Sequence, residues 1–174
     1  MDHILTSKKI FLSYKELGEK AMAQVDDSVL NWQANEDSNS IANIVKHLWG
    51  NMLSRFTDFL TTDGEKPWRK RDEEFEPAGM TRAQMMALWE EGWQCVFGTL
   101  DSLTAADLDK TVYIRNEAHF AADAISRQIA HYSYHVGQIV YIAKLQSTGG
   151  WNSLSIPRGK TAEFNAAVMA KGKQ

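Results

Sequence analysis

Proline occurs at only three of the 174 positions, Pro67, Pro77 and Pro157. Because proline interrupts helices, its scarcity leaves several long segments in which a helix can form without interruption. In four of these segments apolar residues recur three and four positions apart, which is the pattern of a helix with one buried face. The sequence therefore predicts an all-α protein.

Capping and turn residues mark the ends of the expected helices. We expect long helices to begin near Ser7, at Asn39 or Ser40, at the capping box that starts with Thr81, and near Phe120. They should end near residue 25, at residues 61–64, near residue 103, and at residue 146. Residues 111–114 form a short extended piece, and a short C-terminal helix starts at Thr161, with Phe164 and Val168 as its anchors.

The arrangement that fits these elements is a four-helix bundle with a short C-terminal helix, built as a single domain over residues 1–174. Residues 65–80 contain two prolines and many charged residues. They predict an exposed loop of unusual length, and long loops of this kind are often functional.

Charge and hydropathy exclude several classes of protein. The net charge is −3 and no basic patch stands out, so the sequence does not predict binding to nucleic acid. No run approaches the roughly 18 apolar residues of a membrane span. Lysines interrupt the apolar residues near the N-terminus, which does not match a signal peptide. With a single cysteine, Cys95, the expected compartment is the reducing cytoplasm.

The chemistry is concentrated in histidines. His131 and His135 lie four positions apart in the last long helix, so both imidazoles project from one helix face beside the apolar stripe. Two histidines at this spacing can clamp a divalent ion such as zinc, at about 2.0–2.1 Å from each nitrogen. Buried histidines with satisfied hydrogen bonds would give the same spacing, so a third ligand is needed to support a metal site.

His47 is the best third ligand, because it lies midway along the second helix, again beside an apolar stripe. Three protein ligands leave a position open for water or substrate, which is typical of catalytic metal sites. Imidazole suits zinc, nickel, copper and iron, so the spacing does not fix the metal. We expect a divalent ion, with zinc or nickel first.

Other reactive residues have simpler interpretations. His3 and His119 are expected at the surface, and Cys95 as a small buried side chain. The acidic side chains of residues 72–74 and 90–91 are expected to be charged and exposed to solvent. Four further residues have both a structural and a substrate-binding interpretation: Trp49 and Trp93 are core or loop anchors that alternatively line a pocket mouth, and Arg158 and Lys160 are solvated or grip a carboxylate.

Three motifs resemble the DinB-like superfamily: Asn39-Ser-Ile at a helix start, His47-Leu-Trp, and His131-Tyr-Ser-Tyr-His-Val-Gly-Gln-Ile. Residues 67–75 and 151–159 are similar to a functionally uncharacterised bacterial branch of it. The resemblance covers nearly the whole chain. It implies an up-down-down-up four-helix bundle, often dimeric, with a metal held by one histidine of the second helix and two of the last. Here these are His47, His131 and His135.

The resemblance also implies a reaction, because the superfamily includes transferases that use bacillithiol or mycothiol. Our first hypothesis is a metal-dependent S-transferase, in which a bacillithiol-like thiol attacks a small electrophile and Tyr134 or Gln138 orients the substrate. The second is a hydrolase with a metal-bound water, although no carboxylate base can be placed on the histidine face. The third is a non-catalytic, stress-associated metal-binding dimer. We expect a small-molecule substrate, a homodimer, and no nucleic-acid or membrane partner.

Overall fold

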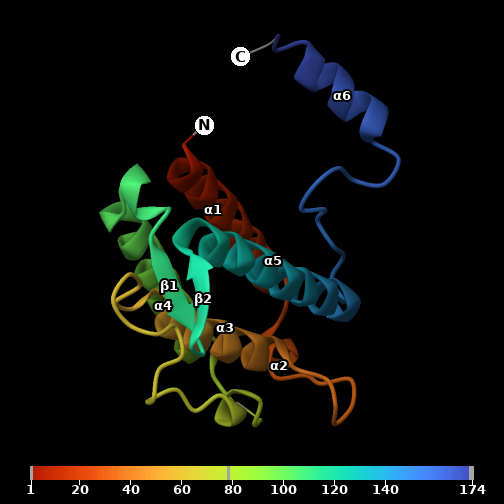
Figure 1. Cartoon of the computed structure of the whole chain (residues 1–174). Helices are drawn as coiled ribbons and strands as arrows, with labels where there is room; N and C mark the ends of the chain where they lie inside the picture. The colour runs from red at the N-terminus through yellow and green to blue at the C-terminus, as the bar shows by residue number, and fades with distance from the viewer. Residues whose placement is uncertain (1, 78, 173–174) are drawn as a thin grey trace.

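The computed structural model describes residues 2–77 and 79–172, most of which are helical (Figure 1). The long helices are α1 (His3–Met22), α3 (Ile41–Phe56), α4 (Arg82–Ser102) and α5 (Ala121–Gln146). Two shorter helices are α2 (Asp27–Leu30) and α6 (Thr161–Met169), and 3-10 turns form η1 (Asp72–Glu74) and η2 (Ala105–Asp107). The predicted helical class is confirmed.

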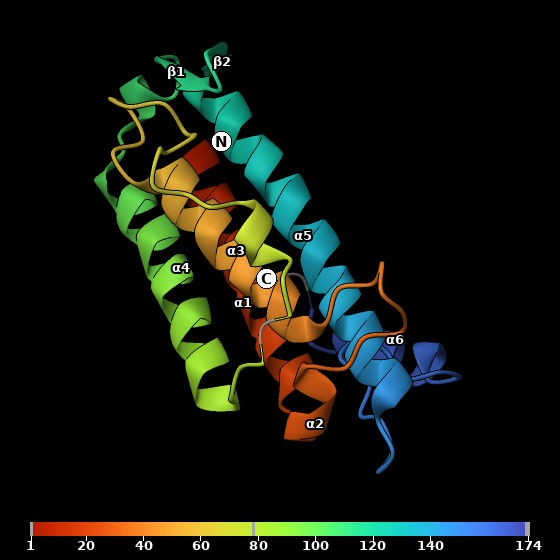
Figure 2. The same cartoon turned by 90° about the horizontal axis from the view of Figure 1, so that it is seen from below.

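The four long helices share one apolar core. α3 packs mainly against α4, and α1 mainly against α5. In Figure 2, α1 and α5 run in one direction, and α3 and α4 run in the other. Each long helix contributes one aromatic side chain to the centre: Phe11 lies 6.3 Å from Phe56, 5.9 Å from Trp93 and 5.6 Å from Tyr132 between ring centroids. Such pairs each add about 0.5–1.5 kcal/mol beyond the burial of their area.

Caps explain where the helices begin. Thr81 and Gln84 form the predicted capping box of α4, and the Ser40 side chain caps α3 by accepting from the amide of Asn43. α1 begins earlier than predicted, because the Asp2 carboxylate accepts from the amide of Leu5 at 3.0 Å. The end predicted for the second helix, at residues 61–64, is wrong. α3 ends at Phe56, and the chain turns away there through the extended Thr57 and through Asp58, whose φ is +50°.

A hairpin follows α4. The predicted extended piece is strand β1 (Thr111–Ile114), which pairs antiparallel with β2 (Glu117–Phe120), a strand that the sequence did not predict. The two turn residues, Arg115 and Asn116, have φ values of +56° and +61°, as a two-residue hairpin turn with this twist requires. Asp63 accepts both of their amide hydrogens, at 2.8 and 2.7 Å, so the hairpin is tied to the loop after α3.

The C-terminal helix α6 begins at Thr161 as predicted, but it lies apart from the long helices (Figure 1). Its predicted anchors are wrong, since Phe164 and Val168 are 47% and 48% exposed. Across residues 2–77 and 79–172, no helix combines the length and apolar character needed to cross a membrane.

Candidate metal centre

Three imidazoles meet between α3 and α5. His47 projects from α3, and His131 and His135 project from successive turns of α5, as the spacing predicted. The Nε2 atom of His131 lies 3.3 Å from that of His47 and 3.1 Å from that of His135. One ligand atom from each of the three residues lies within 4.8 Å of the others, so together they can hold a metal ion.

Hydrogen bonds fix which ring nitrogens carry protons. His47 Nδ1 lies 2.8 Å from Oε2 of Glu74, and an ionised carboxylate only accepts, so Nδ1 is the donor and Nε2 presents its lone pair. His135 Nδ1 lies 2.8 Å from the amide oxygen of Gln138, whose amide nitrogen donates to the Tyr134 hydroxyl. His47 and His135 therefore both point a lone pair towards His131.

This donor set fits a divalent ion. Two nitrogens bound tetrahedrally to zinc at about 2.0–2.1 Å lie roughly 3.3–3.4 Å apart, close to the 3.3 and 3.1 Å between the Nε2 atoms of the triad. Without a cation, converging lone pairs would repel one another, and His131 has only one proton to place between its two neighbours. The tautomers and the spacing are thus those of metal ligands with one side open.

Burial keeps His131 and His135 neutral. Loss of solvation, together with repulsion from His135 and His47, lowers the pKa of His131 to about 3. Loss of solvation also lowers the pKa of His135 to about 4, although its bond to Gln138 works in the opposite direction. Neutral imidazoles have their lone pairs available at neutral pH, which is the protonation state that metal binding requires.

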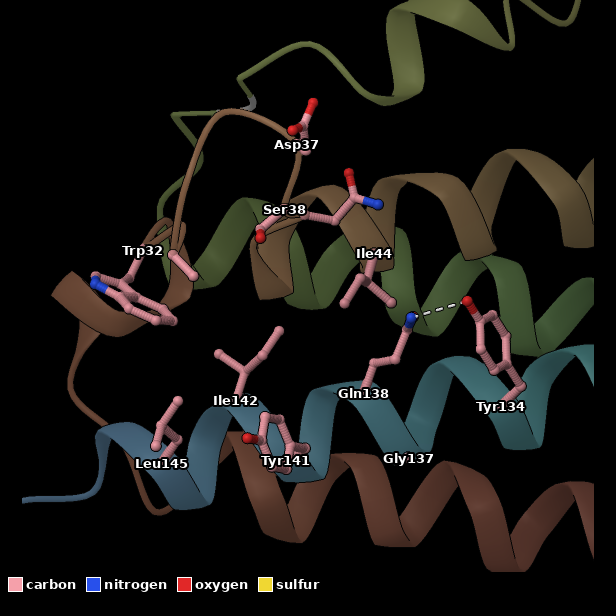
Figure 3. A pocket seen from close by; sticks show the side chains of 12 residues that line it. Trp32, Asp37, Ser38, Ile44, Tyr134, Gly137, Gln138, Tyr141, Ile142 and Leu145 are labelled. Atoms are coloured by element: carbon pink, nitrogen blue, oxygen red, sulfur yellow. Dashed lines mark hydrogen bonds between the residues drawn. The ribbon is translucent and has the colours of Figure 1, made fainter.

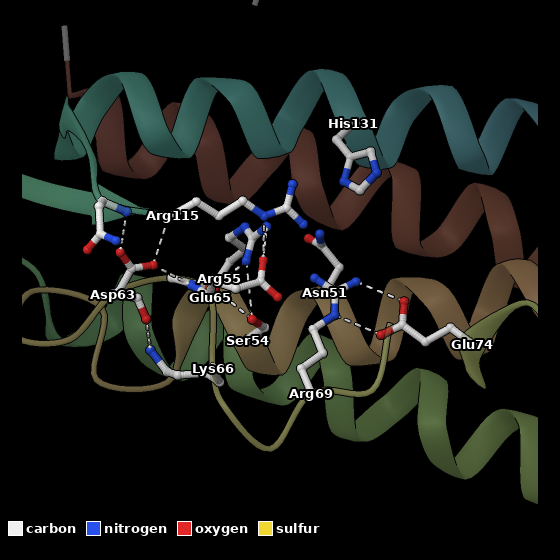
Figure 4. Close-up of polar contacts among 12 residues, drawn as sticks. Asn51, Ser54, Arg55, Asp63, Glu65, Lys66, Arg69, Glu74, Arg115 and His131 are labelled. Atoms are coloured by element: carbon white, nitrogen blue, oxygen red, sulfur yellow. Dashed lines mark hydrogen bonds and ion pairs between the residues drawn. The ribbon is translucent and has the colours of Figure 1, made fainter. Parts of the chain in front are cut away.

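Glu74 is the functional residue that sequence reasoning missed. The prediction that residues 72–74 are solvated charge is wrong for Glu74, which is buried on η1. Arg69 donates to both of its oxygens, from Nε at 2.7 Å and from Nη2 at 2.8 Å (Figure 4). Although burial opposes ionisation, hydrogen bonds from Arg69 and His47 lower the pKa of Glu74. The carboxylate is therefore charged and held in place, and it orients the His47 ring.

A glycine makes room for this carboxylate. Gly50 lies three residues after His47 on α3, and a Cβ there would come within 3.0 Å of the Glu74 Cδ atom. An isolated glycine inside a helical pattern often has a packing reason. Gly50 was the one sign in the sequence that another segment packs closely beside His47, although it did not identify that segment.

Most described residues of the predicted loop are exposed, as expected, but its middle part packs over the centre. The Phe75 ring lies 5.0 Å from the His47 ring, and Asn43 on α3 donates to the carbonyl of Glu76 at 2.7 Å. Arg69 and Glu74 are almost fully buried there, whereas Asp72 and Glu73 are exposed. Residues 69–76 thus close one side of the histidine site.

The triad opens into a cavity of about 440 Å³. Beside the histidines its wall contains polar residues of α3 and α5, including Asn51 and Gln128, and five arginines: Arg55, Arg69, Arg71, Arg115 and Arg127. Figure 4 shows Arg55, Arg69 and Arg115 close to Asn51 and His131. A groove of about 560 Å³ adjoins the cavity, since Asn39 and Tyr134 line both (Figure 3).

The remaining candidates lie outside the cavity. His3 is on α1 and His119 on β2, and both are half-buried instead of at the surface. Burial raises the pKa of the Cys95 thiol, which does not favour a reactive thiolate.

The two tryptophans and the two basic tail residues also lie outside the histidine cavity. Trp93 is in the core, and Trp49 donates to Glu91 at 2.9 Å outside this cavity. Arg158 and Lys160 are exposed in the tail.

No curated protein and no solved structure is significantly similar to the chain. A family model described as protein of unknown function DUF1572 matches residues 1–160, which include the three histidines, Glu74 and all five arginines of the cavity. The chain therefore belongs to the DUF1572 family.

Proposed function

We propose that the protein binds one divalent metal ion through His47, His131 and His135, and that it is a metal-dependent S-transferase. The observation that carries the proposal is the convergence of the three Nε2 atoms in a cavity of small-molecule size. A bound divalent ion would stabilise the thiolate form of a coordinated low-molecular-weight thiol, such as a bacillithiol-like cofactor, at neutral pH.

The chain's own residues hold and orient the participants. Glu74 and Gln138 fix the tautomers of His47 and His135, and Phe75 shields the His47 ring. In the transfer, the thiol sulfur forms a bond to an electrophilic carbon, the leaving group departs with the bonding electrons, and the thiol proton passes to solvent. Tyr134, at the edge of the cavity, is placed to contact the electrophile.

The absence of acidic side chains from the described lining of the cavity favours thiol transfer over hydrolysis. A metal-dependent hydrolase usually needs a general base near the bound water. None of the described residues lining the cavity is acidic, and Glu74 behind His47 is occupied by Arg69. The hydrolase therefore stands second. A non-catalytic metal-binding dimer associated with stress is the third possibility.

We infer further that the chain is related to the DinB-like superfamily and forms an up-down-down-up four-helix bundle. The directions of the four long helices in Figure 2 support this arrangement. We also propose that it acts in the cytoplasm as a homodimer on a small molecule, without a nucleic-acid or membrane partner. Light scattering after size-exclusion chromatography tests the dimer.

The proposal is tested first by metal content. Protein purified without a histidine tag or chelator should contain about one ion per chain by mass spectrometry, the number that one three-histidine site binds. The variant His47→Ala/His135→Ala should contain none, whereas His119→Ala should retain it because His119 does not line the cavity. Equal metal content in all three proteins would refute the site.

Activity then separates the candidate functions. Metal-loaded protein should conjugate a thiol to a chromogenic electrophile, and His131→Ala should not, while its helical circular dichroism stays unchanged. Hydrolysis of an activated ester without thiol consumption would favour the hydrolase. Full metal binding with neither activity would favour the non-catalytic dimer.

A further inference from the structure

The cavity beside the histidines has an unbalanced positive charge. Five arginines line it, and three carboxylates lie next to them: Glu65 and Glu74, which form ion pairs with arginines, and Asp63, which accepts the Arg115 amide and attracts Arg55. Glu65 is shared, since its Oε2 accepts from Arg55 at 3.3 Å and from Arg115 at 2.9 Å. Glu74 neutralises Arg69 alone. The whole chain is acidic, with a net charge of −3, so the positive charge is local to this cavity.

Two arginines have no carboxylate partner among the described residues. Arg127 on α5 and Arg71 form no ion pair with a described residue, and the guanidinium carbon of Arg71 lies 5.1 Å from the centroid of the Phe75 ring. The two enter the cavity wall from different elements, α5 and the segment before η1. Arginine binds carboxylates and phosphates through paired, charge-assisted hydrogen bonds, so two such groups at one cavity form an anion-binding wall.

Neutral polar groups complete this wall. Asn51 accepts a hydrogen bond from the Tyr132 hydroxyl at 3.1 Å through Oδ1, so its Nδ2 group can donate to a different partner. Gln128 is 4% exposed, and its amide oxygen has no hydrogen-bond partner among the described residues. Gln128 therefore borders the cavity as a neutral polar side chain that adds no charge to it.

The adjoining groove has a different character. Its wall contains more apolar and aromatic side chains, namely Trp32, Ile44, Tyr141, Ile142 and Leu145, beside the polar Asp37, Ser38, Asn39 and Gln138 (Figure 3). Tyr141 and Leu145 are 68% and 57% exposed, although they lie on the same helix as His131 and His135. Because Asn39 and Tyr134 line both spaces, one molecule can extend from the arginines into the groove.

We propose that the substrate is an organic anion whose carboxylate or phosphoryl group is held by Arg71 and Arg127 and whose apolar part lies in the groove of Tyr141 and Leu145. This inference deepens the proposed function, because it names the substrate class of the same site and places the substrate beside the metal ligands. A nucleic acid is a poorer fit, since a cavity of about 440 Å³ has the size of a small molecule.

Calorimetry with four small probes tests the proposal. Phenylphosphonate and benzoate carry both an anion and a ring, methylphosphonate has only the anion, and phenol has only the ring. Each is titrated into metal-free protein in a low-salt Tris buffer, and again into metal-loaded protein. Phenylphosphonate or benzoate should bind at least about tenfold more tightly than methylphosphonate or phenol, because both halves of the site are then used.

Variants assign the two halves. Arg71→Gln/Arg127→Gln should weaken binding of the ring-bearing anions at least about tenfold, since charge-assisted hydrogen bonds are lost. Arg158→Gln, an exposed arginine of the tail, is the matched control and should change nothing. Tyr141→Ser/Leu145→Ser should remove the advantage of phenylphosphonate over methylphosphonate. All of these side chains are exposed, so the fold should persist.

The outcomes separate this inference from the proposed function. A preference for benzoate assigns a carboxylate and a preference for phenylphosphonate assigns a phosphoryl group, and either supports the inference. Binding of phenol as tight as that of the anions, or unchanged binding in Arg71→Gln/Arg127→Gln, would overturn it. Metal binding without anion binding would overturn the inference alone, whereas anion binding by a protein that binds no metal would overturn only the proposed function.

Discussion

Replacing Glu74 by glutamine tests whether this carboxylate orients the metal ligand. The substitution keeps the shape of the side chain but removes its charge. Glutamine can present either its C=O or its NH₂ group to His47 Nδ1, so the tautomer that directs the His47 Nε2 lone pair into the site is no longer fixed. Loss of such a partner typically reduces metal affinity about 10–100-fold.

The same change also affects stability, because the Arg69 side chain is only 2% exposed and loses its charged partner. Removing one member of a buried ion pair costs about 3–5 kcal/mol. We expect Glu74→Gln to lower the free energy of unfolding by about 3 kcal/mol, the low end of this range, because the amide oxygen still accepts a hydrogen bond from Arg69. Urea unfolding measures this loss, and competition with a chromophoric zinc chelator measures the metal affinity.

Glu73→Gln is the matched control. Glu73 precedes Glu74 directly, but its side chain is 64% exposed, and it pairs with Lys70 at the surface. Its substitution should change stability by no more than about 0.5 kcal/mol and leave metal affinity unaltered. If Glu74→Gln binds zinc as tightly as the parent protein, Glu74 does not orient His47 towards a metal. A loss of stability alone would reduce its role to pairing Arg69.

Two further predictions concern packing and pH. Gly18→Ala on α1 should destabilise the protein by about 1–3 kcal/mol, because its Cβ would come within 2.8 Å of the Trp89 ring. Gly98→Ala on α4 is the control and should stabilise the protein by up to about 1 kcal/mol, because a Cβ there meets nothing within 4 Å. Equal changes of the two variants in urea unfolding would contradict the packing argument. The pKa values of His131 and His135, about 3 and about 4 in the fold, lie below the value of about 6.5 in an unfolded chain, so the unfolded state takes up protons first. Stability of the metal-free protein should therefore be complete above about pH 6.5 and fall as the pH is lowered towards 4. A free energy of unfolding that does not change between about pH 7 and 5 would contradict the neutral state of His131 and His135.

The parts of the structure that follow from local chemistry were predictable. The capping box at Thr81 and the i, i+4 spacing of His131 and His135 depend on residues close in sequence. His47 could be added because its helix edge adjoins an apolar stripe. Glu74 could not, because its burial depends on the path of an irregular segment and on the room left by Gly50.

The grouping of the five cavity arginines could not be predicted from the sequence either, since they come from four separate segments of the chain. The sequence shows that these side chains are charged but not that they line one cavity.

The exposed position of α6 was missed for a related reason. Its apolar residues have helical spacing, yet the part of the chain that the structure describes offers no surface against which they pack.

The division of the long helices into two layers has a mechanical consequence. His47 belongs to the layer of α3 and α4, whereas His131 and His135 belong to the layer of α1 and α5. Metal–nitrogen distances tolerate deviations of only about 0.2 Å. Sliding of one layer along the other would therefore change the affinity for the ion long before it disturbed the core.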